Sequence, residues 1–463
     1  MKIHLIAVCG TGMASLAGLL KEKGYEVTGS DQNVYPPMSD QLAAMGVNVL
    51  SGYKPENLDI AKPDLVVVGN AISKDNAEVL EVQKRGLTLL SMPQAIAELF
   101  LENKFPLVVA GTHGKTTTAS LLSWVLERSG QSPSFFVGGI LKNFGRSYQL
   151  GSGDYFVLEG DEYDTAFFDK GPKFLHYRPR MLILNAVEFD HADIYKDLAH
   201  VMASFEKLVS LLPKDGVILA DGDSPNVRTL IAKAPCKVVT FGLDSKVSLT
   251  ADQIAFGEKT VFRALRDREE IARFESPLPG RHNLKNLLGV LGVALELGIM
   301  AADVQRALSE FESVKRRQEI LGTFRGVTLV DDFAHHPTAV AETLAALRGK
   351  FGKSKLWAVF EPRSNTTRRN IFQNDFAKAF DAADEIVFAA PYLAEKIPED
   401  ERLHPEQIVA DLKARGKKAF FLPSLDEIVA LIQRDAKPGD VVCFMSNGGF
   451  GGIYDRTIQA LKS

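Results

Sequence analysis

The stretch PLVVAGTHGKTTTASLLSWVL, residues 106–126, joins a short apolar run to a glycine turn and then to a helix-forming segment. A strand followed by a glycine turn and a helix is typical of phosphate-binding loops, because backbone N–H groups and the helix N-terminus then face an anion. The usual pattern G-x-x-x-x-G-K-[ST] requires a glycine at position 109, where this chain has Val109. The shorter pattern G-x-x-G-K-T keeps each functional group, so we interpret the stretch as a nucleotide-binding loop.

The residues of this loop have separate expected roles. Gly111 and Gly114 let the backbone wrap closely around a phosphate, and Lys115 supplies a cation for the β- and γ-phosphates. Either Thr116 or Thr117 supplies a hydroxyl for Mg²⁺. The alternative is a glycine turn that merely opens an ordinary helix. The consecutive threonines after the lysine and the strand before the turn favour nucleotide binding.

The composition is that of an ordinary globular protein. Of the 463 residues, 46% are hydrophobic and 24% are charged, and this length predicts about three domains. The net charge of −4, without a block of Lys or Arg, argues against a nucleic-acid-binding surface. The three cysteines lie far apart and give neither a metal-ligand spacing nor a disulfide framework. Since no signal peptide or bilayer-spanning stretch is visible, we expect a cytoplasmic protein without membrane insertion, as a monomer or weak homodimer.

Apolar strands alternate with helical stretches along the chain, which predicts parallel sheets with helices on both faces. The expected fold class is α/β, with three consecutive α/β domains. A Rossmann-like domain is expected over residues 1–103, a P-loop-type ATPase domain over 104–313, and a second Rossmann-like domain over 314–463. Residues 246–276 alternate in a way that favours antiparallel strands. Substrates are then expected in clefts where the loops at the carboxyl ends of the strands face each other.

Two further loops follow strong strands of the middle segment. EGDEYD (159–164) places four carboxylates at the end of an apolar strand, and EFDHAD (188–193) places His191 after another strand. An acidic loop is usually solvated surface, and a lone histidine is usually structural. Because the carboxyl ends of parallel strands meet at one edge of a sheet, we expect Glu159, His191 and Lys115 to converge. Mg²⁺ takes oxygen ligands, which makes Glu159 a candidate ligand.

The first segment carries a weaker nucleotide signal. We expect CGTGMAS (9–15) to form a turn before a helix, which places Gly10 and Gly12 after the first strand, and Asp31 follows the second strand. This is similar to a dinucleotide fingerprint, in which an acid about 20 residues on meets a ribose, but Ser15 replaces the third glycine. The pattern supports binding of a nucleotide-like diphosphate. It leaves a nicotinamide oxidoreductase and a non-catalytic ATP or GTP switch as alternatives.

The third segment contributes arginines to strand-end loops. Arg316 and Arg317 precede a strand, and DDFAHHP (331–337) follows the next one. Arg363 lies in EPRSN after a further strand. An exposed basic pair is usually only surface. At a domain junction, however, Arg317 is placed to reach a transferred phosphate, where a rigid and permanently charged donor is useful.

Taken together, these motifs resemble those of the Mur ligase family, ATP-dependent enzymes that build the peptide of bacterial cell-wall precursors. The resemblance covers essentially the whole chain, and several motifs in the right order are more specific than any one alone. The motifs are GTHGKTT at 111–117, Glu159, Asn185 with Asp190 and His191, GRHNLKN at 280–286, Arg317, and Asp332 with His335.

Shorter stretches indicate a branch within the family. VTGSD and DDFAHHP are similar to members that act on UDP-N-acetylmuramate, and Tyr163-Asp164 stands where the alanine-adding members usually have Ser-Asp. The stretches that favour a tripeptide acceptor are GSDQNVYPPMS (29–39), DEYDTAFFDK (161–170), HYRPR (176–180), EPRSNT (361–366) and MSNGGFGG (445–452).

The resemblance implies an ATP-dependent amide ligase. It would join the lactyl carboxylate of UDP-N-acetylmuramate to the amine of L-Ala-γ-D-Glu-meso-diaminopimelate through an acyl phosphate, in cell-wall peptide recycling. This activity would connect the protein to cell shape and cell division. The alternative is the L-alanine-adding ligase of de novo peptidoglycan synthesis.

The resemblance also implies roles for individual residues, with Lys115, His191 and Arg317 as the catalytic groups. The residues expected to bind ATP are Gly111, Thr112, His113, Gly114, Lys115, Thr116, Thr117, Asn283, Asn286, Arg317 and Asp332. Those expected to hold Mg²⁺ are Thr116, Glu159 and His191. Those expected to bind the UDP sugar are Gly10, Gly12, Ser30, Asp31 and Asn70. Those expected to bind the peptide are Arg363, Ser446 and Asn447.

One position departs from a pattern of other family members. Some members carry a carbamylated lysine fifteen residues after the His191 position, where this chain has Glu206 beside Lys207. We therefore expect the carboxylate of Glu206 to stand in that place, without carbamylation.

Overall fold

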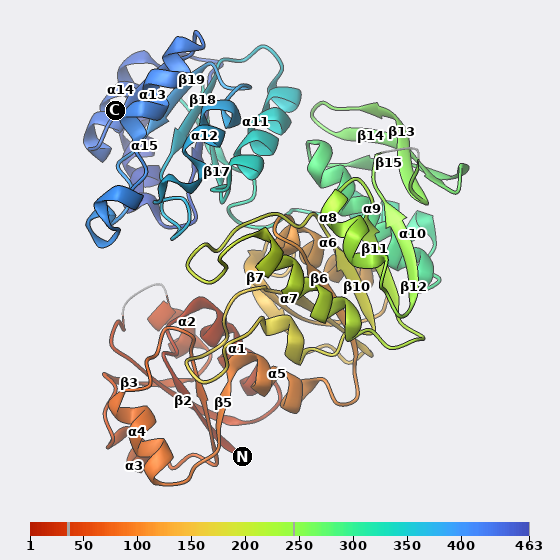
Figure 1. The fold of residues 1–463 in the computed structure, drawn as a ribbon, viewed down its shortest axis with the longest axis vertical. Helices are drawn as coiled ribbons and strands as arrows, with labels where there is room; N and C mark the ends of the chain where they lie inside the picture. Colours follow the sequence, from red (N-terminus) through yellow and green to blue (C-terminus); the bar gives the residue numbers. More distant parts are fainter. Residues whose placement is uncertain (35–37, 244–245, 463) are drawn as a thin grey trace.

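The computed structural model describes residues 1–34, 38–243 and 246–462, and its three sheets follow one another along the chain (Figure 1). Residues 35–37, which belong to the stretch 29–39 quoted above, lie outside the described residues. The first and third sheets lie at opposite ends of the view in Figure 1, and the middle sheet lies between them. The three consecutive α/β domains expected from the sequence are confirmed.

The first sheet has five parallel strands in the order β3-β2-β1-β4-β5. Its strands are β1 (Lys2–Ile6), β2 (Glu26–Asp31), β3 (Asn48–Ser51), β4 (Leu65–Val68) and β5 (Leu89–Ser91). Its helices are α1 (Thr11–Glu22), α2 (Met38–Ala44), α3 (Asn57–Ala61), α4 (Ala77–Lys84) and α5 (Met92–Phe100). Helix α1 begins at Thr11, so most of the stretch 9–15, which was expected to be a turn, is helix.

The middle sheet has ten strands in the order β15-β14-β13-β12-β11-β10-β6-β9-β7-β8. Strand β6 is central, and β9 and β10 flank it in parallel, so the loops after these three strands meet at one edge. Residues 249–276 form antiparallel strands, as the sequence predicted, whereas the hairpin of β7 and β8 was not foreseen. The strands are β6 (Phe105–Ala110), β7 (Ser134–Leu141), β8 (Arg146–Gln149), β9 (Tyr155–Gly160), β10 (Met181–Leu184), β11 (Val217–Asp221), β12 (Lys237–Phe241), β13 (Leu249–Ala255), β14 (Thr260–Arg266) and β15 (Glu269–Ser276).

The helices of the middle part pack on both faces of its sheet. Helix α6 runs directly from the phosphate-loop stretch and packs against α9, so the centre of the domain is built around it. The helices are α6 (Lys115–Arg128), α7 (Leu198–Ser210), α8 (Pro225–Ile231), α9 (Arg281–Glu296) and α10 (Ala301–Ser309), and Lys173–His176 form a 3-10 turn.

The third sheet has six strands in the order β16-β17-β21-β18-β19-β20, of which only β16 is antiparallel to its neighbour. The strands are β16 (Glu319–Phe324), β17 (Val327–Asp332), β18 (Leu356–Phe360), β19 (Glu385–Phe388), β20 (Lys418–Phe421) and β21 (Val441–Met445). The α-helices are α11 (Pro337–Phe351), α12 (Gln373–Ala379), α13 (Pro405–Ala414), α14 (Leu425–Asp435) and α15 (Ile453–Lys462).

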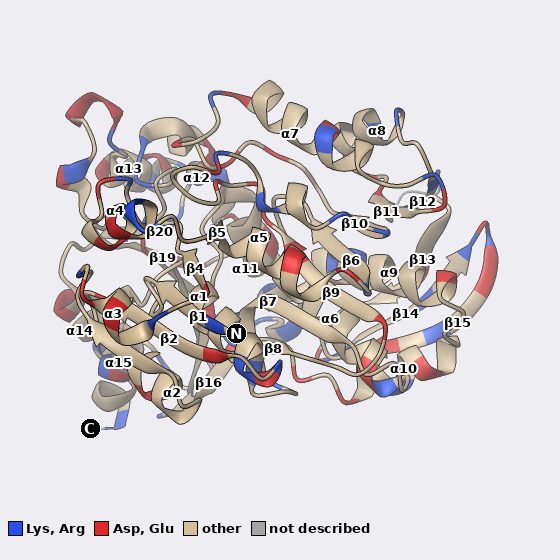
Figure 2. Cartoon of the chain, turned by 90° about the horizontal axis from the view of Figure 1, so that it is seen from below, with Lys and Arg blue, Asp and Glu red and all other residues tan. Residues whose placement is uncertain are grey.

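The domain boundaries fall in segments between elements. We propose to divide the chain after residues 103 and 313, because the first point lies between α5 and β6 and the second between α10 and β16. Figure 2 shows Lys and Arg interspersed with Asp and Glu along the ribbon of all three domains, in keeping with the small net charge of −4. Within the described ranges, no helix combines the length and the apolar character needed to cross a membrane.

Candidate active site

The expected phosphate-binding loop, residues 111–117 (below, the phosphate loop), requires glycine at positions 111 and 114. Gly111 has φ of 129° and Gly114 has φ of 77°, a backbone region that side chains disfavour. A Cβ at Gly111 would lie 2.9 Å from Asn185 Cβ, and one at Gly114 would lie 2.5 Å from Asn286 Oδ1. Glycine therefore lets this loop pack against β10 and α9, and α6 begins at the next residue, Lys115.

Lys115 is held by a carboxylate that follows the neighbouring strand. Its Nζ donates to the carbonyl oxygen of Gly111 at 2.7 Å and to Glu162 Oε2 at 2.7 Å. Burial alone would lower the pKa of Lys115, but Glu162 and Asp161 outweigh it, so the pKa is raised and the ammonium stays charged. The sequence motif thus delivers a cation to the end of β6, and the loop after β9 holds it there.

Thr116, Glu159 and Arg317 meet beside this lysine. Thr116 Oγ1 donates to Glu159 Oε2 at 3.0 Å, and the N–H of Gly138 donates to Glu159 Oε1 at 2.6 Å. Arg317, which precedes the third sheet, donates from Nη2 to Thr116 Oγ1 at 3.1 Å. Its guanidinium also lies over the ring of Phe333, with Cζ 4.7 Å from the centroid. An arginine from the third part of the chain therefore reaches the phosphate loop, as the sequence analysis expected.

His191 reaches the same group of side chains through Glu162. His191 Nε2 lies 3.5 Å from Glu162 Oε1, and the hydroxyl of Tyr195 donates to the backbone oxygen of Glu162. Burial would lower the pKa of His191, but the bond to Glu162 and its charge outweigh it and raise the pKa. The expected convergence of Lys115, Glu159 and His191 is present, with Glu162 as the residue that joins Lys115 to His191.

Glu162 is the side chain that the sequence did not single out. It was one of four carboxylates in the loop at 159–164, and only its burial and its contacts with Lys115 and His191 distinguish it. Glu206, in contrast, was expected in the site and lies outside it. It is exposed on α7 and pairs with Lys233 at 3.0 Å, so the expectation that its carboxylate stands in the site was wrong. Helix α7 turns that position outward, a direction that residue spacing does not reveal.

A cavity of about 590 Å³ lies between the middle and third sheets, next to the phosphate loop. Asn283 and Asn286 contribute to its wall from the start of α9, and Asn283 Nδ2 donates to the carbonyl of Pro279 at 2.8 Å. Asp332 lies across from them and accepts the N–H groups of Gln318 and Ala334, both at 2.7 Å. Further lining residues that the sequence analysis missed are Asp221, Lys285, His282, Gln318 and Glu342.

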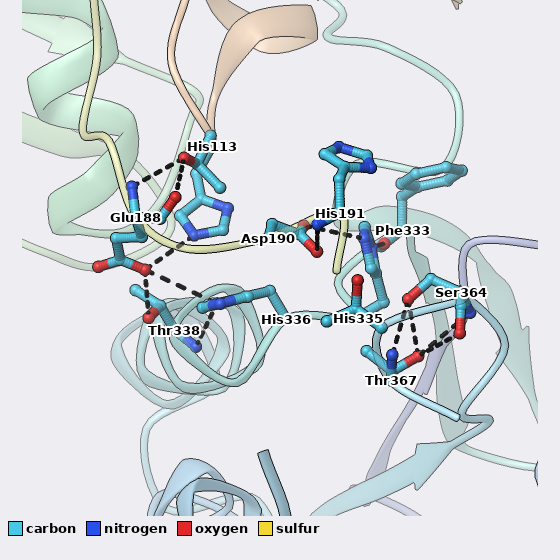
Figure 3. Close-up of polar contacts among 12 residues, drawn as sticks. His113, Glu188, Asp190, His191, Phe333, His335, His336, Thr338, Ser364 and Thr367 are labelled. Carbon is cyan, nitrogen blue, oxygen red and sulfur yellow. Dashed lines mark hydrogen bonds and ion pairs between the residues drawn. The ribbon is translucent and has the colours of Figure 1, made fainter. Parts of the chain in front are cut away.

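The remaining loop residues are tied to the loop after β10. Thr112 donates its N–H to the carbonyl of Ala186 at 2.8 Å and its hydroxyl to the carbonyl of Glu188 at 3.1 Å. His113 Nε2 lies 3.1 Å from Glu188 Oε2 (Figure 3). Thr117 lines the cavity. The phosphate loop and the loop at 185–191 therefore form one connected unit.

The first sheet carries the expected UDP-sugar residues at the ends of β1, β2 and β4. Asp31 accepts the N–H of Cys9 at 2.9 Å, so it fixes the turn that contains Gly10. Gly12 lies inside α1, where a Cβ would come 3.2 Å from Met92 Sδ. Two of the expected residues have different surroundings: Ser30 is buried and donates to Glu78 Oε2 at 2.6 Å, and Asn70 is exposed.

The expected peptide-binding residues form one group beyond the third sheet. The guanidinium of Arg363 stacks over the ring of Tyr392 at 3.7 Å, and Ser446 donates to Glu361 Oε2 at 2.6 Å. Asn447 Oδ1 is buried and has no hydrogen-bond partner among the residues described. Arg316 holds this loop by donating to the carbonyls of Ser446 and Gly448, both at 2.7 Å.

The donor set fits the groups that the fold implies. The hydroxyl of Thr116 and the carboxylate of Glu159 are hard oxygen donors of the kind that Mg²⁺ prefers. Lys115 and Arg317 supply the positive charge that a triphosphate needs. A cavity of about 590 Å³ is within the usual size range for a small ligand such as a nucleotide.

Known families match all three parts of the chain. The profile described as Mur ligase family, catalytic domain, matches residues 2–104, the Mur ligase middle domain matches 109–294, and the Mur ligase, glutamate ligase domain matches 316–448. A curated relative from Escherichia coli K12 is 40% identical over 468 aligned residues, which cover 100% of this chain and 98% of the relative. The chain belongs to the Mur ligase family. That relative is named UDP-N-acetylmuramate–L-alanyl-γ-D-glutamyl-meso-2,6-diaminoheptandioate ligase.

Two further Mur ligases are similar to this chain over nearly its whole length. A crystal structure of a murein peptide ligase from Psychrobacter arcticus 273-4 superposes with a TM-score of 0.73 at 35% identity, covering 100% of this chain and 99% of that one. A UDP-N-acetylmuramate–L-alanine ligase from Acetivibrio thermocellus is 32% identical and covers 98% of this chain and 94% of its own length. These ligase relatives leave no support for the oxidoreductase and switch alternatives.

Proposed function

We propose that this Mur ligase is an ATP-dependent carbon–nitrogen ligase. It joins the lactyl carboxylate of UDP-N-acetylmuramate to the amine of L-Ala-γ-D-Glu-meso-diaminopimelate. The observation that carries the proposal is the reach of Arg317 to Thr116, because it assembles a phosphate site from two domains next to a nucleotide-sized cavity. The full-length relative with this activity in its name supports the choice of substrates.

The reaction follows from the types of residue present. The lactyl carboxylate attacks the γ-phosphorus of ATP, which forms an acyl phosphate and releases ADP. The amine of the L-alanyl residue then attacks the acyl carbon, and the tetrahedral intermediate collapses to an amide and inorganic phosphate. Two anions must approach each other in the first step, so Lys115 and Arg317 neutralise charge as it shifts between oxygens. Water is excluded from the acyl phosphate when the third domain lies against the middle one.

We assign the individual binding roles as follows. Lys115, Thr112, His113, Thr117 and the loop glycines bind the ATP phosphates, while Asn283, Asn286 and Asp332 face the adenosine. Thr116, Glu159 and His191 hold Mg²⁺, which when bound would supply charge to the phosphates. Gly10, Gly12, Ser30, Asp31 and Asn70 bind the UDP sugar. Arg363, Ser446 and Asn447 bind the peptide, and the unpaired buried oxygen of Asn447 supports this last assignment.

The L-alanine-adding activity is the second candidate, because relatives with that name are similar over nearly the whole chain. Tyr163 favours the tripeptide. Its hydroxyl donates to Asp161 at 2.7 Å and the ammonium of Lys173 lies 4.0 Å from its ring centroid, so this tyrosine is integrated beside the site. A serine at that position could not form the ring contact with Lys173, and its shorter side chain could not extend as far.

One assay separates the two acceptors. Phosphate release is measured with UDP-N-acetylmuramate and ATP, with either the tripeptide or free L-alanine as the acceptor. Tripeptide-dependent release that exceeds release with alanine supports the proposal, whereas the reverse order assigns the chain to the alanine-adding activity. Transfer of ¹⁸O from the lactyl carboxylate into inorganic phosphate tests the acyl phosphate, and amide formation without label in the phosphate would contradict this route.

The cellular setting is also part of the proposal. We place the reaction in the cytoplasm, in peptidoglycan synthesis and recycling, and through the wall in cell shape, the cell cycle and cell division. The free state of Cys9, Cys236 and Cys443 supports a reducing compartment. We propose a monomer or a weak homodimer as the working state.

A further inference from the structure

A cluster apart from Thr116 and Glu159 joins the middle domain to the third domain. His113 lies in the phosphate loop, Glu188 lies in the loop after β10, and His336 directly precedes α11 (Figure 3). One ligand atom from each of these side chains lies within 4.8 Å of the other two. We propose that His113, Glu188 and His336 bind a divalent transition-metal ion of the Zn²⁺ class, which links the two domains.

The distances within the cluster suit one tetrahedral ion. His113 Nε2 lies 3.1 Å from Glu188 Oε2, and His336 Nδ1 lies 3.7 Å from the same oxygen. Three ligands that are each about 2.0–2.1 Å from a tetrahedral Zn²⁺ lie roughly 3.4 Å from one another. Small side-chain rotations therefore suffice. Two imidazoles and one carboxylate are a ligand set that Zn²⁺ takes, with the fourth position left to water.

The surroundings of His336 and Glu188 favour the unprotonated forms that a metal requires. Burial lowers the pKa of His336 to about 4, and the neighbouring His113 acts in the same direction, so the His336 ring is neutral near neutral pH. Burial alone would raise the pKa of Glu188. Its hydrogen bonds to His113 and Thr338 outweigh burial and lower the pKa to about 2, so the carboxylate is ionised.

Neighbouring groups orient the ligands. His336 Nε2 lies 3.3 Å from the carbonyl of Phe189, the kind of contact by which a metal-ligating histidine fixes its tautomer, and this leaves Nδ1 as the electron-pair donor. Thr338 Oγ1 donates to Glu188 Oε2 at 2.8 Å. The N–H of Thr338 also donates to His336 Nδ1 over 3.3 Å, and this long hydrogen bond is the one that an ion would replace.

The cluster has an entry path from a second cavity. A cavity of about 420 Å³ is lined by Glu188, His336 and Thr338, and also by Phe372 and Lys378 at the two ends of α12. The His336 ring packs edge-on against Phe372 with centroids 4.6 Å apart, which holds the ring at this wall. An ion can therefore reach the cluster without passing through the cavity assigned to the nucleotide.

The ligand types separate this site from the magnesium site. Imidazole nitrogen suits Zn²⁺, whereas Mg²⁺ prefers the oxygen donors of Thr116 and Glu159. An ion at the proposed site would tie the phosphate loop directly to the first turn of α11. It would thus oppose separation of the middle and third domains.

The test is a calorimetric titration of the metal-free full-length protein with ZnCl₂ in the presence of excess Mg²⁺. The wild type is expected to bind one Zn²⁺ tightly. Glu188→Gln and His336→Asn are each expected to weaken that binding by about 100-fold or more, since even outer contacts of metal sites contribute about 10- to 100-fold. His335→Asn, one residue away, and Glu159→Gln, in the magnesium site, are the matched controls and are expected to bind Zn²⁺ as the wild type does.

The coordination is read separately by X-ray absorption at the zinc edge, where nitrogen and oxygen ligands at about 2.0–2.1 Å are expected. Thermal unfolding of each variant without metal shows whether the variant is folded. Because Glu188 lies in the middle domain and His336 in the third, one local folding defect does not explain loss of Zn²⁺ binding in both variants. The proposal is overturned if the wild type has no tight Zn²⁺ site, or if the wild type and both ligand variants bind Zn²⁺ with equal affinity. It is also overturned if Glu159→Gln or His335→Asn loses binding instead.

Discussion

Two strand–turn–helix junctions of this molecule look alike in sequence and differ in what surrounds them. The turn between β1 and α1 contains Gly10, has no lysine or arginine, and is fixed by Asp31, which accepts the N–H of Cys9. The turn between β6 and α6 is followed by Lys115, which pairs with Glu162, and by Thr116, to which Arg317 of the third domain donates.

The difference teaches that a glycine turn before a helix provides an anion site, while charged groups from other strands decide its chemistry. Backbone N–H groups are enough to hold a diphosphate that does not react. A phosphoryl group in transfer needs cations placed where charge develops. This contrast supports the proposed assignment of the UDP group to the first junction and of ATP to the second.

The largest expected effect is at the second junction. Lys115→Ala removes the cation from the phosphates, so ligation measured by tripeptide-dependent phosphate release is expected to fall by about 10³-fold or more. Because the change also removes one of the two partners of the buried Glu162, the double variant Lys115→Ala/Glu162→Gln is the control for folding. Activity above a tenth of the wild-type value in either variant would contradict the assignment of the ATP site.

The next effect separates two adjacent arginines. Arg317→Ala is expected to lower kcat by about 10²- to 10³-fold with little change in the unfolding temperature, since its guanidinium serves the phosphate loop. Arg316→Ala is the matched variant. Arg316 donates to Asp331 at 3.0 Å and to two loop carbonyls, so its loss is expected to lower the unfolding temperature of the third domain. Equal kinetic and thermal effects in the two variants would remove the distinction.

At the first junction the expected effect is smaller and specific to one substrate. Asp31→Asn removes the charge that fixes the turn, so KM for UDP-N-acetylmuramate is expected to rise about 10-fold, the equivalent of ~1.4 kcal/mol. KM for ATP is expected to stay unchanged. Asp64→Asn is the control, because Asp64 accepts the N–H of Lys2 at the other end of the same sheet. A rise in KM for ATP would show that the two junctions are not independent.

The smallest expected effect is a pH dependence that only the second junction has. His336, which contacts the phosphate-loop residue His113, has its pKa lowered to about 4 by burial, against an unfolded value of about 6.5. A depressed histidine pKa means that the unfolded chain binds more protons, so stability is lost as the pH falls below about 6.5. Acting in the same direction, Glu188 loses its contribution below its unfolded value of about 4.3.

This dependence is measured by thermal unfolding in the presence of a chelator, between pH 7.5 and pH 5. At pH 5 the loss through His336 is at most about 2 kcal/mol, and Glu188 contributes almost nothing because pH 5 lies above its unfolded pKa of about 4.3. The wild type is expected to lose more stability over this range than His336→Asn does. Parallel curves for the two proteins would show that His336 is not neutral and buried in the folded state.

Much of the fold could be predicted because its signals are local. Apolar runs and glycine turns predicted the parallel strands around Lys115, and alternation predicted the antiparallel strands over 249–276. The hairpin of β7 and β8 was missed because its residues 134–149 contain several glycines and no clean alternation. The start of α1 was misplaced, since glycine and serine, which recur at 10–15, favour turns and caps over helix interiors.

The candidate site could be predicted in its parts but not in its connections. Loops at the ends of parallel strands must lie at one edge, so the meeting of Lys115, Glu159 and His191 followed from strand order. Which carboxylate pairs with Lys115 depends on side-chain direction, and so Glu162 was missed and Glu206 was wrongly expected to contribute.

The sequence by itself determined the three α/β domains, the phosphate loop and the family, because each rests on residue types at fixed spacing along one segment. Only the tertiary structure decided that Arg317 reaches Thr116 and that His336 lies beside His113 and Glu188. These contacts join residues that are far apart in the chain. Their distances depend on how one domain packs against another, and no local pattern encodes that packing.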